Sequence, residues 1–127
     1  MTARIALRWL LGVLYLVAAY FHLASPAPFI QVTPDWVPMK PAVILWTGIA
    51  EGAGAIGLLQ LWWPRLRRAA AIGLALYAVC VFPANINHFA LDMARTDGGL
   101  GLAYHLPRMA LQPVLVWLAL WTGGVID

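Results

Sequence analysis

Four long runs of apolar residues, separated by short polar segments, dominate the chain. The runs cover about residues 5–23, 41–63, 69–91 and 107–126. Each has roughly the 20 residues that a helix needs to cross the hydrocarbon core of a bilayer. Strands of a membrane barrel would instead alternate in polarity over about ten residues, and these runs do not alternate. The pattern therefore predicts an all-α fold, an integral membrane four-helix bundle, with a single transmembrane domain over residues 1–127.

The segments between the runs carry the residues that interrupt helices. A proline-rich segment with Asp35, Trp36 and Lys40 follows the first run, and we expect it to be a loop. Residues 64–68 are expected to form a tight basic turn, and residues 92–106 a polar, glycine-containing loop. Pro83 removes a backbone donor, so it is expected to interrupt the third helix near its end.

Composition strengthens the membrane interpretation. The chain is 63% apolar and 10% charged, whereas a soluble domain is roughly half apolar and a quarter charged. A disordered segment would need low hydrophobicity and many charges, so the composition also excludes a disordered chain. Cys80 is the one cysteine, so an internal disulfide or a C-x-x-C redox pair is excluded. The net charge of +3 comes from basic residues that form no long stripe, so nucleic acid is not an expected partner.

The basic residues predict an orientation. Five arginines fall on one side of the predicted bundle and three basic residues on the other, namely Arg4, Arg8, Arg65, Arg67 and Arg68 against Lys40, Arg95 and Arg108. Because short cytoplasmic loops carry the excess of Lys and Arg, both termini should lie in the cytoplasm. We expect a multi-pass protein of the inner (plasma) membrane. The first run also has the basic start of a cleavable signal peptide, but we expect it to remain as a span.

The polar residues within the runs gather in the outer half of the bilayer. Glu51 lies ten residues after Pro41, so about 15 Å below the outer edge, near the midplane. A carboxylate there costs several kcal/mol unless it is paired or protonated. Arg108, His22 and His88 are its candidate partners, and glycines flanking Glu51 would let a neighbouring helix approach. The alternative is that Glu51 only fixes the packing of the helices.

A second polar group is expected near the start of the fourth run. Asn85 and His88 are three residues apart and share a helix face, and they could line a pocket with Arg108 and Gln112. The alternative is a kinked helix end that enters the interface. His22 and His88 at matched depth could ligate a haem, and three histidines with Asp92 could hold zinc or copper. No diagnostic spacing supports either, so we expect no metal site and no haem, and assign these residues to hydrogen bonding or proton exchange.

The order of these features resembles the DoxX family of small four-helix membrane proteins. The resemblance runs through nearly the whole chain. It rests on the following residues: His22, Pro26, Phe29 to Pro34, Trp36 and Pro38; Gly48 to Gly54 and Gly57 to Leu59; Arg67 to Ala70; Val81 to Ile86; Tyr104 to Arg108, Gln112, Pro113 and Trp117.

This resemblance implies a four-helix fold and an association with quinone-linked redox systems. The leading hypothesis is an accessory subunit of a quinone-linked respiratory or redox complex, whose pocket holds a quinone headgroup or passes protons. Other membrane or redox subunits are the expected partners, and a homo-oligomer is left open. Its candidate residues for ligand binding or proton exchange are His22, Glu51, Asn85, His88, Arg108 and Gln112. A structural or assembly subunit without ligand chemistry is the alternative, followed by a small-solute carrier.

Overall fold

The computed structural model describes residues 2–127, and within them the chain is all-α, as the sequence predicts. It has five helices, four of them long. They are α1 (Ala3–Ala24), α2 (Ala27–Val32), α3 (Lys40–Leu59), α4 (Pro64–Ala94) and α5 (Leu102–Thr122).

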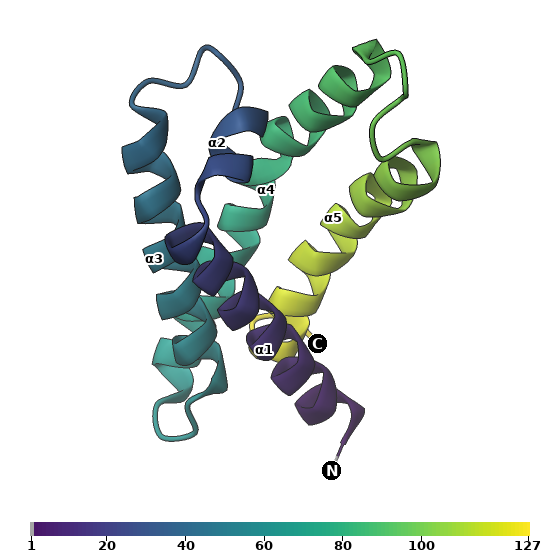
Figure 1. The fold of residues 1–127 in the computed structure, drawn as a ribbon. Coiled ribbons are helices and arrows are strands. Elements are labelled where there is room, and N and C mark those ends of the chain that lie inside the picture. The colour runs from purple at the N-terminus through teal and green to yellow at the C-terminus, as the bar shows by residue number, and fades with distance from the viewer. Residues whose placement is uncertain (1) are drawn as a thin grey trace.

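The four long helices pack side by side in the order α1, α3, α4, α5. α1 and α5 also contact each other, at the end of the bundle that holds the termini. α3 packs against α1 and α4, and α4 packs against α5. Both termini and the turn between α3 and α4 lie at the same end of the molecule, while α2 and the α4–α5 loop lie at the other (Figure 1). At the end with the termini, Arg4 on α1 donates hydrogen bonds to the carbonyl oxygens of Trp121 and Ile126. α1 and α5 diverge from there towards α2 and the α4–α5 loop (Figure 1).

Small residues bring the helices together around an apolar core near the termini. The buried core consists of Leu11, Tyr15, Ala55, Leu58, Ala71, Leu74, Ala75 and Ala119. Gly57 on α3 lies against Ala70 on α4, where an added Cβ would come within 2.7 Å of the alanine Cβ. Close approach at such positions is the usual way in which membrane helices gain van der Waals contact. Most of the buried polar side chains lie towards the opposite end of the bundle, although Arg8 and Thr122 are buried near the termini.

Within residues 2–127, three helices have the length and the apolar composition needed to cross a membrane. These are α1, α3 and α4, so the chain is a multi-pass membrane protein with three candidate spans. α5 has 21 residues, but Arg108, Gln112 and two prolines keep it outside this set. Many large apolar side chains on the long helices are exposed, as lipid contact requires; examples are Leu14, Trp46, Ile56, Leu76 and Val114.

Several predicted boundaries were wrong, and proline explains most of the differences. The segment expected to be a loop contains α2, which Pro26 precedes. The basic turn expected at residues 64–68 is the first turn of α4, because proline at the first helical position lacks only a donor that would be unpaired there anyway. The turn itself is residues 60–63, where the Gln60 side chain bonds the backbone of Trp62 and Trp63.

The third and fourth predicted helices are also longer than expected at the end away from the termini. α4 continues through Pro83 to Ala94, so the proline does not interrupt it. α5 begins at Leu102 rather than near residue 107. The loop between them is thus reduced to residues 95–101, where three glycines have positive φ. This short loop brings side chains from the end of α4 and the start of α5 into contact.

Candidate functional site

A cavity of about 750 Å³ lies among all five helices. Its walls are mostly apolar. The polar side chains on them are Tyr15, His22, Thr33, Thr47, Glu51, Tyr77, Asn85, His88, Tyr104, Arg108 and Gln112. All six residues that the sequence analysis selected as site candidates lie on the wall of this one cavity.

An acidic group occupies one side of the cavity. Glu51 on α3 is only 2% exposed, and its Oε2 lies 2.7 Å from Nδ1 of His22 on α1. The Tyr77 hydroxyl on α4 donates a second hydrogen bond of 3.1 Å to the same oxygen. Within residues 2–127 no hydrogen bond is made to the other oxygen, Oε1. Of the three partners considered for Glu51, the structure therefore selects His22.

Gly48 makes the contact between α1 and α3 possible. A Cβ added at Gly48 would lie 2.8 Å from the His22 Cβ, so the two helices could not approach as closely with any larger residue. The Phe29 ring of α2 packs on the His22 imidazole with ring centres 4.0 Å apart. Glycine on one side and an aromatic ring on the other thus hold the imidazole against Glu51.

A cationic and amide group occupies another part of the cavity wall. Nε and Nη2 of Arg108 on α5 donate to Oδ1 of Asn85 on α4, at 3.3 and 3.1 Å. The Asn85 amide donates to Oε1 of Gln112, and Gln112 donates to the Ala78 carbonyl at 2.7 Å. The chain of bonds orients Arg108 and links α5 to α4.

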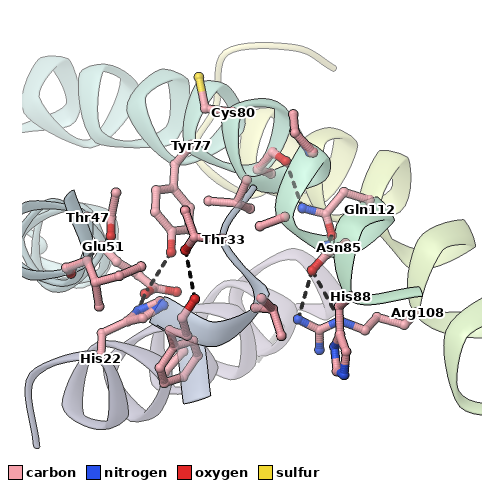
Figure 2. Close-up of a pocket in the computed structure, with 18 of the residues that line it drawn as sticks. His22, Thr33, Thr47, Glu51, Tyr77, Cys80, Asn85, His88, Arg108 and Gln112 are labelled. Atoms are coloured by element: carbon pink, nitrogen blue, oxygen red, sulfur yellow. Dashed lines mark hydrogen bonds and ion pairs between the residues drawn. The ribbon is translucent and has the colours of Figure 1, made fainter. Parts of the chain in front are cut away.

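Figure 2 shows these two groups on separate sides of the cavity, with Glu51 and His22 away from Asn85 and Arg108. The apolar wall between them includes Leu14, Val17 and Phe21 of α1 and Leu111 of α5, all of which are also exposed on the outside of the bundle. These are the helices that diverge in Figure 1. Because these lining side chains are also exposed, the cavity reaches the outer surface of the bundle beside α1 and α5.

A third polar group lies at the junction of α4 and α5. Oδ2 of Asp92 lies 2.7 Å from Nε2 of His105 and 3.3 Å from Nε2 of His88, and accepts a hydrogen bond from the Leu100 N–H. In the adjoining loop, the Gly99 N–H and the Arg95 side chain hold the pKa of Asp97 below its usual range. Among these residues only His88 also lines the cavity.

Three residues of this arrangement, Tyr77, Asp92 and His105, were not among the predicted site residues. Tyr77 was not selected, although it lies eight residues before Asn85 and so on the same helix face. Asp92 and His105 were not selected either, since His105 was expected in a loop and its approach to Asp92 depends on how residues 95–101 fold. From the sequence, three histidines with Asp92 were considered as zinc or copper ligands and set aside because no diagnostic spacing supported them. The fold brings two of these histidines, His88 and His105, to Asp92.

Comparison with known families assigns the chain to one of them. A family described as a domain of unknown function (DUF8561) matches residues 11–123. The chain belongs to this family. No curated protein and no solved structure matches it. These comparisons support no assignment to the DoxX family, so that resemblance stays a prediction.

The region shared with the DUF8561 family contains the whole candidate site. Every residue that lines the cavity lies between positions 11 and 123, as do Asp92 and His105. The family description names no activity, and any function must therefore be argued from the residues of the site.

Proposed function

We propose that this chain is a DoxX-like accessory subunit of a quinone-linked redox complex in the inner membrane, and that the cavity binds the quinone headgroup. One observation carries the proposal: a single cavity combines apolar walls open towards lipid with two separate hydrogen-bonding groups. Its volume of about 750 Å³ falls within the range of small-molecule sites. A quinone is an apolar molecule with two carbonyl oxygens on opposite sides of its ring, so it needs such a combination.

The two polar groups of the cavity would have different roles, one in hydrogen bonding to the quinone and one in proton exchange. Arg108 keeps a cationic guanidinium on the cavity wall and is oriented by Asn85, so it can donate to one carbonyl oxygen. His22 and Tyr77 hydrogen-bond to Oε2 of Glu51, so Oε1 is the oxygen that can accept or donate a proton. In this proposal the Glu51–His22 pair exchanges protons with the quinone. A bound quinone would supply two-electron chemistry, with the electrons delivered by the partner redox subunit.

The proposal includes four membrane crossings with both termini in the cytoplasm. Two features support α5 as the fourth span. Its outer surface exposes Leu106, Leu111, Val114 and Trp117. The N- and C-termini also lie at the same end of the molecule, as an even number of crossings requires (Figure 1). With the arginine-rich start of α4 in the cytoplasm, the cavity lies in the outer half of the bilayer.

The test is quinone binding to the purified chain in lipid nanodiscs. Trp36 lines the cavity, so quenching of tryptophan fluorescence by ubiquinone-2 can report binding. Arg108→Gln and Glu51→Gln should each raise the Kd by about tenfold, a loss of about 1.4 kcal/mol of binding free energy. Arg95→Gln is the matched control, because Arg95 pairs with Asp97 in the loop and does not line the cavity.

One observation favours a structural or assembly role as the second candidate. The Glu51–His22 pair joins α1 to α3, and the Asn85–Gln112 pair joins α4 to α5. If the wild type binds no quinone, and the same substitutions lower abundance or association with partner subunits, the structural role replaces the proposal. Solute flux into proteoliposomes without quinone binding would instead favour a small-solute carrier.

A further inference from the structure

The third polar group has the donor atoms of a metal site. Two imidazole nitrogens and one carboxylate oxygen, from His88, Asp92 and His105, all lie within 4.8 Å of one another. His105 is 1% exposed and Asp92 5% exposed, so the group is well shielded. Two of the three donors are four residues apart on α4, and the third comes from the first turn of α5.

The surrounding backbone fixes the carboxylate independently of the histidines. The Leu100 N–H donates to Asp92 Oδ2 at 3.0 Å. Gly99 lies directly against the carboxyl group with φ of 57°, and an added Cβ there would overlap Asp92. Such an outer hydrogen bond is what orients a ligating carboxylate in metal sites. The loop of residues 95–101 therefore does more than connect two helices, because its backbone packs against the Asp92 carboxyl group and donates a hydrogen bond to it.

We propose that His88, Asp92 and His105 bind a divalent transition metal, with Zn²⁺ as the best fit. Zinc prefers imidazole nitrogen and carboxylate oxygen at about 2.0–2.2 Å, and three such ligands leave a fourth position for water. Tetrahedral ligands at that range lie about 3.3 Å apart. The His88–Asp92 distance of 3.3 Å already fits, and the His105–Asp92 distance of 2.7 Å needs to open by about 0.6 Å.

The metal site is separate from the proposed quinone site. Asp92 and His105 do not line the cavity, and His88 alone belongs to both. The site lies beside the loop of residues 95–101, at the end of the bundle away from the termini (Figure 1). The His88 side chain is 22% exposed and leaves a route for an aqueous ion. A bound ion would join the end of α4 to the start of α5. The inference does not depend on quinone binding.

The experiment measures metal binding by the full chain in detergent after treatment with a chelator. Competition with a chromophoric chelator should give one Zn²⁺ per chain, and Co²⁺ should give visible bands of a four-coordinate site. Asp92→Asn and His105→Gln should each weaken Zn²⁺ binding at least tenfold. Asp97→Asn is the control and should bind as the wild type does, because Asp97 does not belong to the cluster.

A second variant keeps the test valid if the first ones fold poorly. In a Cys80→Ala background, His105→Cys replaces one ligand by another, so it should retain Co²⁺ and add a thiolate-to-cobalt charge-transfer band. A purely structural hydrogen bond would not produce that band. Absence of stoichiometric Zn²⁺ binding by the wild type, or unchanged binding by Asp92→Asn, would overturn the inference. Quinone binding by Asp92→Asn should stay intact, which separates failure of this site from failure of the cavity proposal.

Discussion

At the scale of single residues, Gly48 has the largest consequence for the cavity. It lets the backbone of α3 approach the base of the His22 side chain, and this approach allows the 2.7 Å contact between His22 and Glu51. Without that contact the buried carboxylate would keep only the hydrogen bond from Tyr77 to offset its desolvation. The acidic side of the cavity therefore depends on the absence of one side chain.

Gly48→Ala should destabilise the protein and weaken quinone binding. The new methyl group would meet the His22 Cβ at 2.8 Å, and neither backbone nor Cβ can move aside cheaply. Overpacking of this kind costs about 1–3 kcal/mol. Thermal unfolding in detergent should show a lower Tm. Gly73→Ala is the control, because nothing lies within 4 Å of its Cβ position and alanine favours a helix, so its Tm should not fall. Equal Tm values for the two variants would contradict the argument.

The sequence alone identified which residues are polar and deep, but not how they pair. Glu51, His22, Asn85, His88, Arg108 and Gln112 could be selected because polar groups in predicted spans are costly and few. The pairing of Glu51 with His22 rather than Arg108 depends on which helices are neighbours, and α1 packs on α3. His105 could not be selected, since its position is set by seven loop residues with three glycines at positive φ.

At the scale of the helices, the contact between α1 and α5 sets where the cavity opens. Arg4 donates to the Trp121 and Ile126 carbonyl oxygens at 2.8 and 2.9 Å, and its guanidinium lies 5.4 Å from the centre of the Trp121 ring. A cation at the carboxyl end of a helix is favoured by the unpaired carbonyl groups there. Because this contact closes the bundle at one end, divergence of α1 and α5 is confined to the other.

Arg4→Gln should lower the stability by about 1 kcal/mol, since it removes charged hydrogen bonds from a half-exposed position. The expected result is a decrease of a few degrees in Tm in detergent. Arg65→Gln serves as the control: Arg65 is also near the end with the termini but is exposed at the start of α4. If both variants unfold at the wild-type temperature, Arg4 does not hold the two helices together.

Proline explains why helix ends were harder to predict than helix existence. The four apolar runs correspond to the four long helices, but α2 was hidden within a segment rich in proline, and Pro64 starts a helix instead of marking a turn. A proline at the first helical position is compatible with the helix, whereas the same residue in its interior removes a hydrogen bond. Which case applies depends on the neighbouring residues.

At the scale of the whole molecule, the two halves of the bundle differ in kind. The apolar core lies in the half near the termini, and the cavity with its polar groups lies mainly towards the other end. Exposed tryptophans mark both ends, with Trp62 and Trp63 on the α3–α4 turn and Trp36 before α3. Tryptophan favours the two interfaces of a bilayer. This distribution is consistent with the proposal that the half with the cavity binds a ligand while the other half holds the helices together.

The orientation can be tested with single cysteines in a Cys80→Ala background. We expect Thr96→Cys, in the α4–α5 loop, to react with a membrane-impermeant maleimide in intact cells. Trp62→Cys, at a position 79% exposed in the α3–α4 turn, should react only after permeabilisation. The reason is that the arginines at the start of α4 favour the cytoplasm. Asp127→Cys decides the role of α5: protection in intact cells means four crossings, whereas labelling together with Thr96→Cys means three and would overturn the four-span proposal.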